Sequence, residues 1–181
     1  VIAVGGDLAL AALALGELTP LAGRGRRYQL PIADGSFTLI DESYNANPGS
    51  MHAALKSLAS QSIQGRGRRI AVLGDMGELG EETARYHRDL APDITGGDIH
   101  LTFTTGTHTQ ELVQMLPIES RGGHAPNAGA LGELLLLSLR PGDVVMVKGS
   151  NYTGMGAVVK ALLKLENPDQ PVRQAGNGNV L

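Results

Sequence analysis

Short, continuous apolar runs alternate along the chain with stretches in which apolar residues recur every three or four positions. The continuous runs are typical of buried parallel strands, and they cover residues 70–74, 99–106 and 143–149. The periodic stretches predict helices over residues 48–58, 81–90, 109–116, 130–139 and 157–165. Strands that alternate with helices at this spacing predict an α/β fold with a Rossmann-like, mostly parallel sheet flanked by helices.

The helix at residues 48–58 has the clearest start signal. Asn47 is a favourable N-cap residue, and Pro48 costs no hydrogen bond at the first helical position. One face of this helix is apolar and is predicted to be buried; it carries Met51, Ala54, Leu55 and Leu58.

Two further segments give opposite predictions. The runs YQLPI and SFTLI, at residues 28–32 and 36–40, flank Asp34 and Gly35, which favour a tight turn. We therefore predict a β-hairpin ahead of the parallel sheet. The segment GGHAPNAG, at residues 122–129, is predicted to be a loop because it combines glycine, proline and asparagine.

The two ends of the chain differ from its middle. Residues 1–18 are apolar and predict a buried helix that stops near Gly16, and no apolar stretch reaches the ~20 residues that span a membrane. The basic, glycine-bearing segment 21–27 is the predicted domain boundary, and its arginines either stay solvated or contact a phosphate. We expect a fragment, with residues 1–22 ending one domain, 23–181 forming the next, and 166–181 a frayed tail.

Composition excludes several classes of protein. The 181 residues contain no cysteine, which rules out a disulfide framework and a thiolate metal site. The net charge of −3 offers no basic excess, so nucleic acid is not an expected partner. Aromatic residues make up only 3% of the chain, which leaves few anchors for a large permanent interface and favours a monomer.

Polar loops follow three of the predicted strands. They are DESYNAN at residues 41–47, GDMGE at 74–78 and KGSN at 148–151. Because ligands bind beyond the carboxyl ends of parallel strands, we expect these loops to form one rim. Such a rim can hold a zwitterion or a nucleotide, since amides bind a base or ribose and a cation binds a carboxylate or phosphate.

Each loop also has a purely structural explanation. Asp41, Asn45 and Asn47 can hydrogen-bond a tight turn, as such residues often do. Asp75 and Glu78 can instead complement the start of the helix that follows them.

Three common site motifs are absent from the sequence: a phosphate-binding loop, a histidine metal site and a hydrolase nucleophile motif. Lys148-Gly149-Ser150 resembles the end of a phosphate loop, but Val147 stands where that motif requires glycine, and G-x-x-x-x-G-K-[ST] occurs nowhere. Lys148 can therefore be an ordinary solvated charge. The five histidines show no metal-ligand spacing, and no G-x-S-x-G motif indicates a hydrolase.

Three motifs in a fixed order carry a resemblance to a known family. They are DESYNANPGSMHAAL at residues 41–55, VLGDMGELG at 72–80 and VKGS at 147–150. Together they resemble the C-terminal part of the Mur ligases, in particular the members that add D-alanyl-D-alanine to UDP-MurNAc-tripeptide. Gly23-Arg24 is similar to the family's joint between its central and last domains.

The resemblance implies an ATP-dependent ligase of cytoplasmic peptidoglycan precursor synthesis. ATP would phosphorylate the terminal carboxylate of UDP-MurNAc-tripeptide, and the amine of D-alanyl-D-alanine would attack the acyl phosphate. It also implies that the phosphate loop and the ligands of Mg²⁺ lie in the central domain, of which residues 1–22 would be the end. No catalytic or metal-binding residue is expected in this fragment, which is expected to be inactive alone.

The resemblance also implies roles for residues of the rim. On the ATP side it assigns Arg24, Asp41, Tyr44, Asn45 and Asn47. On the side of the incoming dipeptide, rim geometry and the resemblance together assign Asp75, Glu78, Lys148 and Ser150.

One departure from the family pattern bears on substrate binding. Many relatives have an arginine soon after the Lys-Gly-Ser motif, whereas this chain continues Asn151-Tyr152-Thr153. Two alternatives therefore stay open: a sister Mur or folylpolyglutamate-type ligase domain that accepts another amine, and a stand-alone nucleotide-binding module without catalysis.

Overall fold

A six-stranded sheet runs through the computed structural model, which describes residues 5–16 and 20–166. In spatial order its strands are β1 (Arg26–Ile32), β2 (Gly35–Glu42), β6 (Val144–Lys148), β3 (Arg69–Gly74), β4 (Leu101–Thr105) and β5 (Arg121–Ala125). β1 is antiparallel to β2, and every other neighbouring pair is parallel. The predicted α/β fold with an N-terminal hairpin is therefore confirmed.

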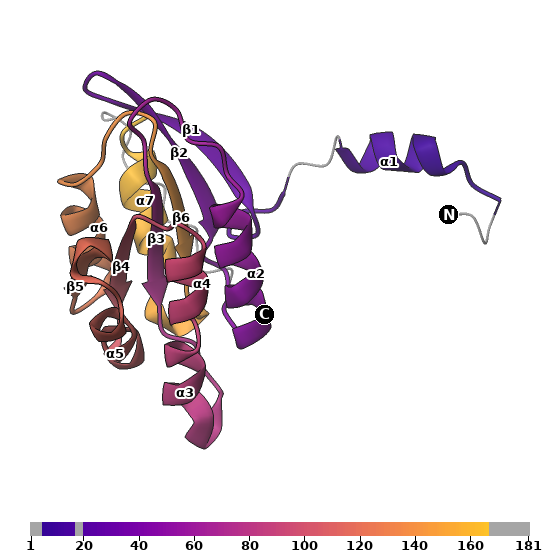
Figure 1. Cartoon of the computed structure of the whole chain (residues 1–181). Helices are drawn as coiled ribbons and strands as arrows, with labels where there is room; N and C mark the ends of the chain where they lie inside the picture. The colour runs from indigo at the N-terminus through magenta and orange to yellow at the C-terminus, as the bar shows by residue number, and fades with distance from the viewer. Residues whose placement is uncertain (1–4, 17–19, 167–181) are drawn as a thin grey trace, which may run out of the picture.

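Helices cover both faces of the sheet (Figure 1). On one face lie α2 (Pro48–Ala59), α4 (Ala91–Gly96) and α5 (Thr107–Met115), and on the other lie α6 (Ala128–Leu136) and α7 (Gly156–Leu163). Alternate residues of each strand face opposite layers. In β3, Ala71 and Leu73 pack in the first layer, whereas Ile70 and Val72 pack in the second.

The last strand of the sheet lies in its middle. After β5 the chain crosses the second face through α6 and returns as β6 between β2 and β3. All five residues of β6 are buried, as the apolar run predicted. The chain then leaves β6 toward α7 on the second face, whereas β2 is followed by α2 on the first. Loops that diverge in this way open a crevice at the carboxyl edge.

Most of the predicted helices are confirmed to within a few residues. α2 begins at Pro48, its N-cap Asn47 accepts a hydrogen bond from the Ser50 amide, and its four predicted core residues are buried. The predicted helix at 81–90 is shorter and interrupted: a 3₁₀ turn (Gly80–Glu82) precedes α3 (Thr83–Arg88), and α4 follows as a separate helix. α3 projects beyond the carboxyl ends of β3 and β4 (Figure 1).

The prediction of a loop at residues 122–129 is wrong, because β5 occupies Arg121–Ala125 and pairs with β4. The glycines that suggested a loop have a packing role. A Cβ atom on Gly122 would lie 2.5 Å from Cε2 of Phe103, so only glycine lets this edge strand approach the buried ring.

α1 (Leu8–Gly16) is helical but is not buried, which corrects the prediction from its apolar sequence. Leu8, Leu10 and Leu13 are 61%, 66% and 68% exposed, and the helix extends away from the sheet (Figure 1). The rest of the predicted 1–18 helix, at 1–4 and 17–18, and nearly all of the predicted frayed tail, at 167–181, lie outside the described residues. The assignment of 1–22 to a preceding domain stays a prediction.

Membrane-spanning helices are not found in the part of the chain that the structure describes: none of its helices has the required length and apolar character.

Candidate functional site at the carboxyl edge of the sheet

The loops that follow β2, β3 and β6 meet at one edge of the sheet, as the sequence predicted. Lys148 Nζ donates to the Asn45 carbonyl at 3.0 Å, and Ser150 Oγ donates to Asn45 Oδ1 at 3.3 Å. The Ser150 amide donates to the Asp75 carbonyl at 3.0 Å. Gly149 makes this approach possible, since a Cβ atom there would lie 2.9 Å from the Gly74 Cα. These bonds join all three loops into a single rim.

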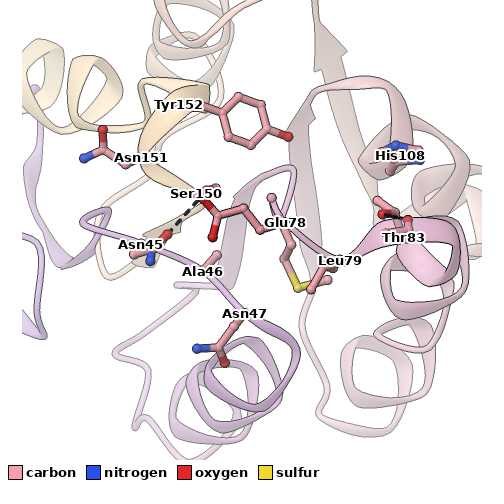
Figure 2. Close-up of a pocket in the computed structure, with 13 residues that line it drawn as sticks. Asn45, Ala46, Asn47, Glu78, Leu79, Thr83, His108, Ser150, Asn151 and Tyr152 are labelled. Carbon is pink, nitrogen blue, oxygen red and sulfur yellow. Dashed lines mark hydrogen bonds between the residues drawn. The ribbon is translucent and has the colours of Figure 1, made fainter.

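The rim encloses a polar pocket of about 780 Å³, which we call the large pocket (Figure 2). Its volume lies in the range of small-molecule sites. It is lined by Asn45, Ala46, Asn47, Met76, Gly77, Glu78, Leu79, Gly80, Thr83, His108, Ser150, Asn151 and Tyr152.

Two smaller hollows adjoin the large pocket. The lysine pocket, of about 280 Å³, is lined by Gly23, Arg24, Glu42, Tyr44, Asn45, Asn47, Ser50 and Lys148. The joint pocket, of about 580 Å³, is lined by Ala22, Gly23, Tyr28, Asp41, Ser43, Tyr44, Asn151, Gly154, Gly156, Ala157, Val159, Lys160 and Leu163.

The three pockets adjoin one another, because each pair of them shares lining residues, and we call the three together the track. Asn151 lines both the joint and the large pocket. Gly23 and Tyr44 line both the joint and the lysine pocket, and Asn45 and Asn47 line both the lysine and the large pocket. The two sets of residues assigned from sequence therefore interleave. Lys148, assigned to the dipeptide side, lies in the lysine pocket with Arg24 from the ATP side.

Lys148 is a buried cation rather than a solvated one. The residue is 3% exposed, and its Nζ lies 3.0 Å from the Asn45 carbonyl and 3.7 Å from Oε2 of Glu42. Burial lowers the pKa of the Lys148 ammonium, and the Glu42 carboxylate opposes that shift. Glu42 lies in the 41–47 loop motif, but the sequence assigned it no role. Only the fold shows that β2 pairs with β6 and so brings Glu42 next to Lys148.

Asp41 fixes the joint to the sheet. Its buried carboxylate accepts hydrogen bonds from the Gly23 amide at 2.8 Å and from the amide and hydroxyl of Ser43 at 3.1 and 2.6 Å. Gly23 has φ +77°, and a Cβ atom there would lie 2.8 Å from the Tyr44 Cβ. Only glycine fits this position, so the chain enters the domain along one fixed path.

Arg24 and Tyr44 stand together at the opening of the lysine pocket. The Arg24 guanidinium carbon lies 4.0 Å from the centroid of the Tyr44 ring, a cation–π geometry. Both side chains are exposed. A cation held in this way over an open hollow is available to an anionic ligand.

Asp75 faces away from the pockets, toward α5. Its carboxylate accepts hydrogen bonds from the Thr109 amide at 2.8 Å and the His108 amide at 3.2 Å. It lines none of the three pockets. The structural explanation from sequence, that Asp75 complements the start of a helix, describes this geometry, although the helix is α5 and not the one that follows directly.

Glu78 and Ser150 do line the large pocket. Glu78 is exposed at φ +60°, a conformation that non-glycine residues rarely adopt, and its carboxylate points toward Ser150 and Asn45 (Figure 2). Ser150 is buried, and its carbonyl accepts hydrogen bonds from the Thr153 amide and hydroxyl.

Two histidines support the rim, and no sequence pattern indicated either. His87 is fully buried, its Nε2 accepts the Met76 amide at 2.8 Å, and its Nδ1 lies 2.7 Å from the Thr83 carbonyl. The proton must therefore sit on Nδ1, which makes His87 neutral. His108 lies beside it, with ring centroids 5.2 Å apart.

Lowering the pH is expected to destabilise the fold through His87. Burial lowers the pKa of His87, an effect that the Thr83 carbonyl and the Asp75 and Glu111 carboxylates oppose and His108 reinforces. The unfolded chain then binds more protons than the native chain in the pH range just below the ordinary histidine value of about 6.5. The stability contributed by neutral His87 is complete above that value and falls as the pH drops below it.

The check is urea unfolding of wild type and His87→Gln at pH 7.5 and pH 5.5. Wild type is expected to lose more unfolding free energy between the two pH values than the variant does. The His124 imidazole, whose pKa burial also lowers, contributes the same background loss to both proteins. Equal losses would contradict the prediction.

Asn47 caps a helix and also lines two pockets, and comparison with the cap residue Asn127 separates the two roles. Its Oδ1 accepts the Ser50 amide at the start of α2, just as Asn127 Oδ1 accepts the Ala130 amide at the start of α6. Each Asn→Ala change is expected to cost about 1 kcal/mol of unfolding free energy. Only Asn47→Ala is also expected to weaken ligand binding, since Asn127 lines none of the three pockets. Thermal unfolding and ligand titration of both variants provide the measurement.

Metal ligation receives no support from the described residues, among which no three histidine or acidic side chains lie together as a metal site requires.

Comparison with known proteins identifies the family of the chain. The family model described as "Mur ligase, glutamate ligase domain" matches residues 26–151. The chain belongs to the Mur ligase family. The match covers both hairpin strands, all three rim loops and the central strand β6.

Relatives of this Mur ligase chain carry a common name. This chain is 35% identical over 156 residues to the UDP-N-acetylmuramoyl-tripeptide–D-alanyl-D-alanine ligase of Mycobacterium tuberculosis (strain CDC 1551 / Oshkosh). The alignment covers 76% of this chain and 31% of the relative. This chain is 33% identical over 140 residues to the ligase of the same name from Escherichia coli (strain K12), covering 76% and 29%. The chain thus spans about 31% of the length of the first of these curated relatives.

Solved structures agree on the fold. A UDP-N-acetylmuramoylalanyl-D-glutamyl-2,6-diaminopimelate–D-alanyl-D-alanyl ligase from Acinetobacter baumannii superposes with a TM-score of 0.69 at 26% identity, covering 90% of this chain and 34% of that one. The MurF ligase from Thermotoga maritima, solved in complex with ADP, gives a TM-score of 0.67 at 19% identity, covering 89% and 37%.

Proposed function

We propose that this chain is the C-terminal domain of an ATP-dependent ligase that joins D-alanyl-D-alanine to UDP-MurNAc-tripeptide in the cytoplasmic synthesis of peptidoglycan precursors. The observation that carries the proposal is the track of three adjoining pockets, in which the polar large pocket lies next to a hollow with two cations, Arg24 and Lys148. The names of the aligned relatives support the same activity.

The track divides the substrates by their chemistry. The joint pocket, which has the more apolar lining, suits the adenosine of ATP, with Asp41 and Tyr44 at its wall. The lysine pocket suits the phosphates, because Arg24 and Lys148 can offset their charge. The large pocket suits a short zwitterionic peptide, with Glu78 and Ser150 among its walls.

This arrangement fits amide synthesis through an acyl phosphate. The carboxylate oxygen of the tripeptide attacks the γ-phosphorus of ATP, which releases ADP. The amine nitrogen of the dipeptide then attacks the acyl carbon, and the C–O bond to phosphate breaks. Asn45 and Asn47 line both pockets involved, so the amine and the phosphate can be held next to each other.

The test is phosphate release by the complete gene product with ATP, magnesium and UDP-MurNAc-tripeptide, with and without D-alanyl-D-alanine. We expect release that depends on the dipeptide, together with a product whose mass has gained the dipeptide. The domain by itself is expected to release none.

Other outcomes would point to other functions. Release with a different amino acid, but not with D-alanyl-D-alanine, would identify a sister Mur or folylpolyglutamate-type ligase. No release with any amine, from a folded protein that binds ATP, would indicate a nucleotide-binding module without catalysis. Sedimentation of the same preparation tests the expected monomer.

A further inference from the structure

His108 lines the large pocket, and one of its two ring nitrogens has no hydrogen-bond partner in the described part of the fold. The Nδ1 atom of His108 is enclosed and has no hydrogen-bond partner among the described residues. Folded proteins leave an enclosed N–H donor without an acceptor more rarely than they leave an enclosed acceptor without a donor. The proton of neutral His108 therefore belongs on Nε2, which is not enclosed in this way.

His108 is held firmly while it presents this donor. Its backbone amide donates to Asp75 at 3.2 Å, and its ring lies against that of His87, 5.2 Å between centroids. Gly106, two residues earlier, has φ +111°, and a Cβ atom there would lie 2.5 and 2.6 Å from the Asp75 carboxylate oxygens. The Asp75 carboxylate thus fixes the turn that places His108 on the pocket wall.

The large pocket has a carboxylate at one end and an imidazole at the other. Glu78 directs its carboxylate toward the side where Ser150 and Asn45 lie, whereas His108 lies on the opposite side (Figure 2). The Tyr152 hydroxyl points toward the His108 side (Figure 2). Among the described residues that line the pocket, Glu78 is the only carboxylate and His108 is the only imidazole.

The neighbouring pocket decides which way a dipeptide lies. Asn45 belongs to both the large and the lysine pocket, so the Glu78 end is the end next to Lys148 and Arg24. The attacking amine must approach the phosphate-bearing carbon, and it therefore lies at this end. The carboxylate of the dipeptide then lies at the other.

We propose that His108 Nε2–H binds the carboxylate of the incoming dipeptide, with its amine beside Glu78, so that His108 determines the preference for an amine substrate with a free carboxylate. This inference rests on the proposed function. Glu78 is placed to accept the proton that the amine loses.

The experiment compares D-alanyl-D-alanine with its C-terminal amide, which has the same amine but no carboxylate. In the complete gene product we expect wild type to prefer the acid. His108→Ala should lower kcat/KM for the acid by roughly 10- to 100-fold, the range for a hydrogen bond to a charged group, while leaving that for the amide nearly unchanged. The preference for the acid should therefore disappear, with the KM for ATP unaltered.

Two further variants keep the test decisive. His108→Gln retains an N–H donor and should keep part of the preference for the acid. It replaces His108→Ala in the test if that variant does not fold. Thr107→Ala changes the exposed residue next to His108, which does not line the pocket. This variant should keep the full preference for the acid over the amide.

The outcomes separate the inference from the proposed function. A wild type that uses acid and amide equally, or a His108→Ala variant that keeps the full preference, would overturn the role of His108 and leave the ligase intact. A wild type that releases no phosphate with any amine would instead overturn the ligase assignment, and the role of His108 with it.

Discussion

If the proposed function holds, Lys148→Met in the complete gene product is expected to lower kcat/KM for ATP by about 100- to 1,000-fold, the loss typical when one preorganised donor to developing charge is removed. Lys148 is nearly fully buried, and its ammonium is held by the Asn45 carbonyl at 3.0 Å on the edge of the lysine pocket. Methionine fills a similar volume without the charge. The phosphates would then lose one of the two cations that line this pocket, the other being Arg24.

The split between kinetic constants shows which ligand Lys148 serves. A rise in the KM for ATP supports the phosphate role, whereas a rise confined to the KM for the dipeptide would place Lys148 with the amine substrate, as the sequence alone suggested. The matched control is Lys164→Met, at an exposed position just after α7 that lines none of the three pockets. Unchanged constants in Lys148→Met would remove this lysine from the site.

Asp143→Asn is expected to lower the free energy of unfolding by about 3 kcal/mol or more, because it leaves a largely buried arginine without its counter-charge. Asp143 is 0% exposed. Its carboxylate accepts hydrogen bonds from Nη2, Nε and the amide of Arg68 at 2.7, 3.1 and 2.8 Å, and from the Arg140 amide at 2.9 Å. An asparagine amide turned toward these donors can accept from only some of them.

The control for Asp143 is an ion pair of similar length at the surface. Asp98 pairs with Arg69 at 2.9 Å, but its side chain is 80% exposed. Asp98→Asn should cost no more than ~1 kcal/mol, since water screens such a pair, and asparagine tolerates the φ of +52° at this position. Urea unfolding of the three proteins gives the comparison. An equal loss of unfolding free energy in Asp143→Asn and Asp98→Asn would show that burial does not strengthen the contribution of the Asp143 pair to stability.

Local signals in the sequence were sufficient wherever neighbouring residues determine the structure. Asn47 and Pro48 fixed the start of α2, because a cap acts within one turn. The apolar run at 144–148 predicted a strand buried on both faces, which β6 is. The Asp34-Gly35 pair predicted the hairpin, in which Asp34 has φ +46° and Gly35 already pairs with Ile32.

The same local signals failed where a distant residue decides. Gly122 and Gly123 indicated a loop, but their lack of side chains admits β5 against Phe103. The sequence predicted no helix at residues 91–96, where α4 forms and Ile94 packs against the core. The apolar α1 suggested burial, yet Leu8, Leu10 and Leu13 are exposed.

For the candidate site, the sequence by itself determined which polar loops meet, because polar residues directly after buried parallel strands gather at one edge of the sheet. It also carried the motifs that place the chain among the Mur ligases. Only the tertiary structure decided that β6 lies between β2 and β3, and hence that Lys148 meets Glu42 and Asn45. It also decided that Asp75 faces α5 and that His108 faces the pocket. Strand order and side-chain direction depend on contacts between residues far apart in the chain, and no local pattern encodes them.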